Sequence, residues 1–212
     1  AEHSAAATEY SPEVLLLQST ALSANVVFIN IDWKASKHNA KAVKSNMKTL
    51  ANTITGVVRD MKPMMICMCE VGLATIPLAE GQMQQVADQS MQAWKEAATE
   101  HFELRSMFQV GAPYMTIYRD GPIQCSCHRI LEDLYYSQGD PRTAQTFLRC
   151  GPGGVNVDVI NVHAPSGRQR LTDEQSKTLL TNLLQRNSKA MLGQTIGSAR
   201  LLIGGDMNTP PF

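Results

Sequence analysis

The sequence predicts an α/β domain in which buried strands alternate with helices. Residues 26–29 and 64–69 are short apolar runs, which are typical of strands covered on both faces. Between these runs, apolar residues recur at steps of three and four across residues 38–60, the pattern of a helix that buries one face against a sheet. A further apolar run at residues 200–204 predicts a strand late in the chain.

Composition favours one domain of ordinary charge. The chain has 212 residues, of which 43% are hydrophobic, enough for one globular domain with its own core. We expect this domain at residues 25–212, after a flexible segment at residues 1–24. The 19 basic and 19 acidic residues balance, which excludes a global positive field for non-specific nucleic-acid binding. No apolar run approaches the roughly 20 residues of a membrane-spanning helix, so we expect a soluble protein without a transmembrane segment.

The cysteines and the first residues bear on the compartment. Five cysteines, an odd number in a chain of this length, favour a reducing environment. The chain begins at Ala1, and its opening residues lack the basic and apolar regions of a signal peptide. Either a leader has been removed or the sequence is a fragment. We therefore expect an intracellular protein, with an organelle after leader removal as one alternative.

The remaining segments continue the alternation of elements. The elements that the pattern predicts are a helix at residues 82–100, short strands at residues 102–110, 114–118 and 145–150, a strand at residues 155–162, and a helix after Thr172. Gln175 stands three residues after Thr172, which is the spacing of a capping box. Residues 119–144 are predicted to be a loop with some structure.

Four predicted strands end in polar residues of catalytic type. Asn30 and His163 end two strands, and Glu70 follows a third. The last strand leads into Asp206 and Asn208. In layered α/β folds, ligands gather where strand ends converge, because loops there hold polar groups without burying them. The sequence therefore predicts a shared site at this edge.

These residue types match the needs of phosphoester hydrolysis. The reaction needs a hard cation held by oxygen ligands, donors for the charge on phosphate, and a group that orients or deprotonates water. Glu70, with Asn30 beside it, is the candidate ligand for Mg²⁺ or Mn²⁺, and Asp206 is the candidate water-activating carboxylate. The candidate phosphate-facing donors are Asn30, His163 and Asn208.

Four segments together resemble a known superfamily. Phe-Ile-Asn-Ile at residues 28–31, Cys-Glu-Val at 69–71, Ile-Asn-Val-His-Ala-Pro at 160–165 and Gly-Gly-Asp-Met-Asn at 204–208 are similar to successive motifs of the endonuclease/exonuclease/phosphatase superfamily. That superfamily includes DNase I, abasic-site endonucleases, LINE-type retrotransposon endonucleases, and inositol-phosphate and sphingomyelin phosphodiesterases. The last two segments look closest to the nuclease and retroelement branches. The resemblance implies a four-layer α/β sandwich over residues 25–210, with two mixed sheets packed face to face and helices outside.

The sequence also departs from the family pattern. Family members carry a later Asp-His motif, whereas this sequence ends at Phe212, so we expect residues 1–212 to lack that motif and the last strands of the sandwich. An open sheet edge would then be available to partner proteins. Ser166 and Arg168 are candidate substrate contacts after the His163 strand. Ser166 replaces an Asn that is frequent in nuclease relatives, and Cys69 replaces a frequent Gln, which bears on substrate class more than on fold.

Each candidate also has a purely structural explanation. Glu70 and Asp206 can be surface carboxylates at strand exits, and His163 a hydrogen-bonded structural histidine. Asn30 and Asn208 can be turn residues, and Arg168 can belong to a solvated loop. The Cys-x-Cys pairs at residues 67–69 and 125–127, the latter followed by His128, suggest zinc, but small buried thiols explain them at this spacing.

Two functional hypotheses follow. The first is a Mg²⁺-dependent, nuclease-like phosphodiesterase that acts on nucleic acid or another phosphodiester. The second is a catalytically impaired domain of the same fold that serves as a structural or binding subunit of a larger assembly. Neutral charge and the absent Asp-His motif favour the second hypothesis, whereas the four strand ends favour the first.

Overall fold

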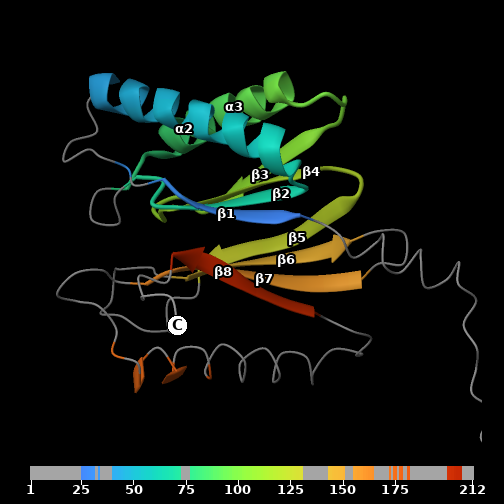
Figure 1. Ribbon diagram of the computed structural model, residues 1–212. Coiled ribbons are helices and arrows are strands. Elements are labelled where there is room, and N and C mark those ends of the chain that lie inside the picture. Colours follow the sequence, from blue (N-terminus) through green and yellow to red (C-terminus); the bar gives the residue numbers. More distant parts are fainter. Residues whose placement is uncertain are drawn as a thin grey trace, which may run out of the picture.

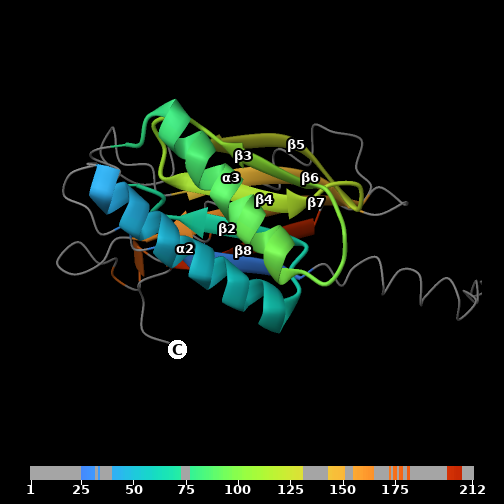
Figure 2. The same cartoon turned by 90° about the horizontal axis from the view of Figure 1, so that it is seen from above.

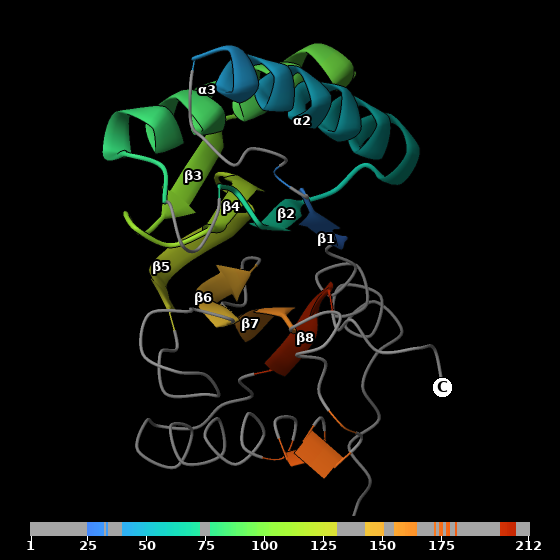
Figure 3. The same ribbon diagram turned by 90° about the vertical axis from the view of Figure 1, so that its left-hand side faces the viewer.

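The computed structural model has two β-sheets packed face to face, with helices on the outside (Figure 1). It describes residues 25–31, 33, 40–72, 77–130, 143–150, 155–164, 172, 174–175, 177–178, 181 and 200–206. Two helices cover the outer face of the first sheet (Figure 2). The helical residues at 174–175, 177–178 and 181 lie beyond the second sheet (Figure 3). The predicted fold class is confirmed.

The first sheet contains the two strands that the apolar runs predict. Its order is β1 (Val26–Asn30), β2 (Met65–Cys69), β4 (Tyr114–Arg119), β3 (Leu104–Phe108). Strands β1 and β2 are parallel, and the other pairs are antiparallel. Every residue of β2 is buried, because one face meets the helices and the other meets the second sheet. This double burial explains its continuous apolar run.

The second sheet contains a strand that the sequence analysis missed. Its order is β5 (Ile123–Ile130), β6 (Thr143–Cys150), β7 (Val155–His163), β8 (Arg200–Asp206), with β7 and β8 parallel. The loop predicted at residues 119–144 was wrong where β5 forms. This strand carries few large apolar residues, and a register shift between Cys125 and Cys127 breaks its period of two.

The two long helices lie close to their predicted bounds. Helix α2 spans Ala40–Met61 and α3 spans Glu80–Ala97. The buried stripe of α2, which packs against the first sheet, consists of Val43, Met47, Leu50, Ile54 and Val58. Helix α3 begins two residues before the predicted Gln82, whose side chain accepts a hydrogen bond from the Ala79 N–H at 3.0 Å.

The capping box predicted at Thr172 is also confirmed. The Gln175 N–H donates to the Thr172 hydroxyl at 3.2 Å, and the Thr172 N–H donates to the Gln175 side chain at 2.9 Å. The two bonds satisfy donors that a helix start would otherwise leave unpaired.

A chain of polar side chains crosses between the two sheets. The Thr116 hydroxyl lies 3.3 Å from that of Thr146, and the Thr146 hydroxyl lies 2.9 Å from His128 Nδ1. His128 Nε2 is buried and has no hydrogen-bond partner within the described ranges. Burial of the ring lowers the pKa of His128 to about 4. The folded protein therefore holds this histidine neutral.

This neutral histidine makes stability depend on pH. An unfolded histidine takes up a proton near pH 6.5, whereas folded His128 does so only near pH 4, so the free energy of unfolding falls as the pH falls through this window. We expect the wild-type protein to lose up to about 2 kcal/mol more between pH 7 and pH 5 than His128→Gln, measured by urea denaturation. His101→Gln, at an exposed position, is the control and should keep the wild-type profile. Equal losses in His128→Gln and the wild type would contradict this account.

Candidate active site

Two pairs of parallel strands deliver the predicted site residues to one end of the sandwich. In the first sheet, Asn30 of β1 lies opposite Cys69 of β2, and Glu70 follows directly beyond that pair. In the second sheet, His163 of β7 lies opposite Asp206 of β8. Both pairs end on the same side of the molecule, at the left of Figure 1 where the β8 arrowhead lies.

Polar contacts join these ends across the gap between the sheets. Asn30 Nδ2 donates a hydrogen bond to Asp206 Oδ2 at 2.6 Å, over 176 residues of sequence. His163 Nε2 lies 3.1 Å from Glu70 Oε1. The structure therefore brings together four of the predicted residues, Asn30, Glu70, His163 and Asp206, which we name the strand-end quartet.

The four side chains of the quartet differ in how deeply they are buried. The side chain of His163 is 11% exposed, whereas that of Glu70 is 31% exposed. Asn30 is exposed and Asp206 is partly buried. The imidazole therefore lies deepest, with the carboxylates and the amide above it, so a substrate would meet charged and polar groups first.

The backbone holds Glu70 in an unusual conformation. Its φ is +56°, in the left-handed region that residues other than Gly and Asn rarely adopt. Hydrogen bonds fix the chain on both sides, because the Ile31 N–H donates to the Cys69 carbonyl at 3.1 Å and the Val71 N–H donates to the Pro113 carbonyl at 3.0 Å. Backbone strain of this kind costs about 1–3 kcal/mol and concentrates at functional sites.

Two glycines allow Asp206 to approach Asn30. A β-carbon on Gly204 would collide with the ring of Phe28, which reaches across from β1. Gly205 has a φ of +125°, and a β-carbon there would collide with the Val162 carbonyl on β7. The Gly-Gly pair before Asp206 therefore serves the close approach of β8 to both β1 and β7.

A buried thiol lies beside the site without the reactivity of a nucleophile. Burial, followed by the charges of Glu70 and Asp206, raises the pKa of Cys69 to about 12. Burial likewise raises the pKa of Cys67 to about 12. Both thiols are free, buried and protonated at neutral pH, which supports the explanation of Cys67 and Cys69 as small core residues.

Some polar residues near the site were not singled out from the sequence. Asn161 is 4% exposed, and its Oδ1 has no hydrogen-bond partner in the described part of the chain. Tyr114 is fully buried and packs with Cys69 and Ala144. The alternation of β7 contains a signal for Asn161, because residues 161 and 163 share one face of the strand. No comparable signal marks Tyr114.

Three predicted site residues are not placed. Ser166, Arg168 and Asn208 lie outside the residues that the structure describes. Their assignment to substrate binding and catalysis stays a prediction.

The donor chemistry of the quartet fits a hard divalent cation. Mg²⁺ prefers oxygen ligands and is commonly held by one or two carboxylates, with water and substrate phosphates completing its shell. Glu70 supplies a carboxylate and Asn30 an amide oxygen at neighbouring strand ends. Within the described ranges, no group of three or more His, Cys, Asp and Glu side chains is arranged to hold a metal. The fit rests on the oxygen donors that Glu70 and Asn30 supply.

Comparison with solved structures identifies the fold. No protein-family model and no curated protein matches the chain. TDP2 of D. rerio in complex with a single-strand DNA product matches with a TM-score of 0.55 at 11% identity over 89% of this chain. TDP2 of C. elegans matches with a TM-score of 0.52 at 15% identity over 93% of this chain. ANGEL2, a 2′,3′-cyclic phosphatase, in complex with adenosine-2′,3′-vanadate, matches with a TM-score of 0.54 at 14% identity over 88% of this chain.

These structures belong to the endonuclease/exonuclease/phosphatase, or DNase I-like, superfamily. The chain has the endonuclease/exonuclease/phosphatase fold. It spans 62% of the D. rerio TDP2 chain, 53% of the C. elegans TDP2 chain and 54% of the ANGEL2 chain. The resemblance found in the four sequence segments is confirmed at the level of fold. No helix in the described part of the chain is long and apolar enough to span a membrane.

The glycine that faces Phe28 provides a test of this packing. Gly204→Ala should destabilise the protein by about 1–3 kcal/mol, because the new methyl group overlaps the Phe28 ring. Gly56→Ala is the matched control, since a β-carbon there meets nothing within 4 Å in helix α2, and it should stabilise by about 0.5–1 kcal/mol. Urea denaturation measures both changes. A neutral Gly204→Ala would mean that the sheets do not approach closely at this point.

Proposed function

We propose that this protein is a divalent-metal-dependent phosphodiesterase of the nuclease type, with the strand-end quartet as its catalytic centre. The observation that carries the proposal is the pair of cross-sheet contacts, Asn30 to Asp206 at 2.6 Å and His163 to Glu70 at 3.1 Å. Polar side chains from four strand ends in two sheets meet in these contacts. A set of surface carboxylates with no joint role would not require this convergence.

Asp206 is the proposed general base. A carboxylate can accept the proton of an attacking water only if it is held in a fixed orientation near the phosphorus. The Asn30 amide, by donating to Asp206 Oδ2, holds the carboxylate in this way. The Gly204-Gly205 segment, which brings β8 close to β1, supports the same geometry.

Glu70 and Asn30 are the proposed ligands for Mg²⁺ or Mn²⁺. A cation bound there would neutralise charge on the phosphate oxygens. Glu70 is suited to this role because its backbone is fixed on both sides and its carboxylate lies against His163. His163 is the proposed donor to the phosphate, since its ring lies at the floor of the site. Asn208, Ser166 and Arg168 would complete the contacts to phosphate and substrate.

A nucleic-acid phosphodiester is the proposed substrate class. The D. rerio TDP2 structure holds a single-strand DNA product, and the ANGEL2 structure holds adenosine-2′,3′-vanadate. Both ligands are nucleic-acid phosphates or analogues of them, which supports this class for a chain of the same fold. The balanced charge of this chain implies that recognition depends on local contacts more than on a global field.

Hydrolysis by matched carboxylate variants tests the proposal. We expect the full chain to cleave a single-stranded oligonucleotide or bis(p-nitrophenyl) phosphate with Mg²⁺ or Mn²⁺ and to lose activity with EDTA. Asp206→Asn should lower kcat by about 10²–10⁴-fold, as removal of a general base does. Glu70→Gln should raise the metal concentration needed for half-maximal rate. Asp120→Asn, at the opposite end of the first sheet beside Arg105, is the control and should leave the rate unchanged.

The same experiment separates the two functional hypotheses. If the intact protein binds no divalent cation and cleaves none of these substrates, the enzyme proposal is wrong and the structural-subunit hypothesis stands. If activity persists in Asp206→Asn, the quartet is not the catalytic centre.

A further inference from the structure

A second concave site lies at the opposite end of the first sheet from the quartet. It opens where α2 and α3 end, beside Pro63, which precedes β2, and Arg119, the last residue of β4. Because β2 has five residues, this site is roughly 15 Å from the quartet. Nothing in the proposed phosphodiesterase chemistry uses it.

Aromatic and aliphatic side chains and three cations are among the residues that line this cavity. Trp94, which is 1% exposed, and Phe102 contribute aromatic surface, and their ring centroids are 6.3 Å apart in an edge-on arrangement. Val58 adds aliphatic surface. The cavity volume is about 150 Å³, which is room for one benzene-sized group.

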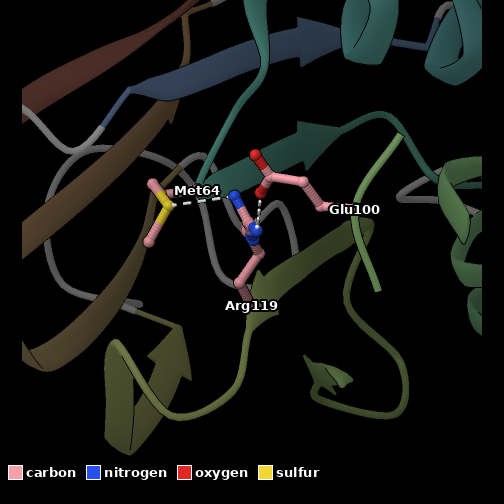
Figure 4. Close-up of polar contacts among 3 residues, drawn as sticks. All are labelled: Met64, Glu100 and Arg119. Carbon is pink, nitrogen blue, oxygen red and sulfur yellow. Dashed lines mark hydrogen bonds and ion pairs between the residues drawn. The ribbon is translucent and has the colours of Figure 1, made fainter. Parts of the chain in front are cut away.

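Arg119 is the charged group built into this cavity. Its guanidinium stacks on the Phe102 ring with 3.8 Å between Cζ and the centroid. It donates to Glu100 Oε2 at 2.7 Å and to the Met64 sulfur at 3.7 Å (Figure 4). Its Nε is buried and has no hydrogen-bond partner within the described ranges. Of its five N–H donors, one therefore has a strong carboxylate acceptor, one has a weak sulfur acceptor, and the buried Nε–H has none in the described part of the chain.

The position of the other two cations in the cavity is explained by the end of helix α2, whereas that of Arg119 is not. Arg59 lies in the last turn of α2, and Lys62 follows that helix with its N–H bonded to the Val58 carbonyl. Cations there complement the negative end of the helix dipole. Arg119 ends a strand, so helix capping does not account for its place in the cavity.

Glu100 is an ion-pair partner of Arg119 that another carboxylate could replace. Its side chain is 71% exposed, whereas that of Arg119 is 19% exposed. The hydrogen bond and charge of Arg119 lower the pKa of Glu100, so this position already stabilises a carboxylate. An exposed side chain loses little by rotating into solvent.

We propose that this cavity binds a small organic carboxylate that carries one ring-sized apolar group. The ring packs in the cavity against Trp94, Phe102 and Val58, and the carboxylate replaces Glu100 on Arg119. The ligand thereby joins the two properties of the cavity, apolar volume and an incompletely paired guanidinium, in one molecule. This site is independent of phosphodiester hydrolysis.

Titration of the full chain with phenylacetate tests the proposal. The chain has two tryptophans, so fluorotryptophan NMR reports Trp94 in the cavity and Trp33 outside it as an internal reference. We expect a saturable shift of the Trp94 signal alone. Acetate, which lacks the ring, and benzyl alcohol, which lacks the charge, should each bind at least about tenfold more weakly than phenylacetate.

Two variants and a matched control complete the test. Glu100→Gln should strengthen phenylacetate binding several-fold, because it removes the competing carboxylate. Since Glu100 is exposed, this substitution should leave the fold intact, and a change in affinity then reports on the site itself. Arg119→Met should weaken binding at least about tenfold. Asp120→Asn, which breaks the Arg105–Asp120 pair away from the cavity, should have no effect.

Three results would overturn the proposal. These are a shift of Trp33 together with Trp94, equal binding of benzyl alcohol and phenylacetate, and unchanged or weaker binding in Glu100→Gln. If Arg119→Met fails to fold, the Glu100→Gln result and the ligand pair still decide between the outcomes.

Discussion

The close approach of β1 and β8 is the constraint on which the site depends. Two sheets that pack through large side chains normally keep their backbones about 10 Å apart. Here Gly204 leaves room for the ring of Phe28, and the next two residues bring the Asp206 carboxylate to 2.6 Å from the Asn30 amide. This contact lies at the end of the sandwich where the polar groups of four strand ends gather. The geometry of the proposed catalytic centre therefore depends on two adjacent glycines, Gly204 and Gly205.

The gap between the two sheets contains groups that reduce the stability of the fold. The face of the first sheet that looks away from the second sheet is mostly apolar and packs against α2 and α3. The inter-sheet gap also holds an apolar cluster, which includes Met65, Ile123 and Val159. To this it adds hydroxyls, thiols and the neutral ring of His128, and Glu70 at its rim has a left-handed backbone. Buried polar groups and strained backbone each reduce stability unless neighbouring contacts compensate. Apolar clusters on both faces of the first sheet supply that compensation.

The sequence predicts the strand ends well because a buried strand and its exit leave a local pattern. Asn30, Glu70, His163 and Asp206 each follow or end an apolar run, and parallel strands necessarily finish at a common edge. The pairing of Asn30 with Asp206 and the strand β5 could not be predicted in the same way. The first depends on how two distant sheets approach, and the second has polar residues and a register shift that hide its period. Arg119 gave no signal at all, because a charged residue at the end of a strand looks ordinary until its aromatic and acidic neighbours are known.

The central claim is that four strand ends form one site for a divalent cation, and paramagnetic NMR with Mn²⁺ tests it most directly. Bound Mn²⁺ broadens the signals of nearby amides steeply with distance, so no substrate or rate is needed. Addition of substoichiometric Mn²⁺ to the ¹⁵N-labelled protein should broaden the backbone amides of Asn30, Glu70, His163 and Asp206 together. The amide of Arg119, at the far end of the sheet, should stay sharp. Broadening that misses the quartet, or that reaches only one of the two sheets, would contradict the account.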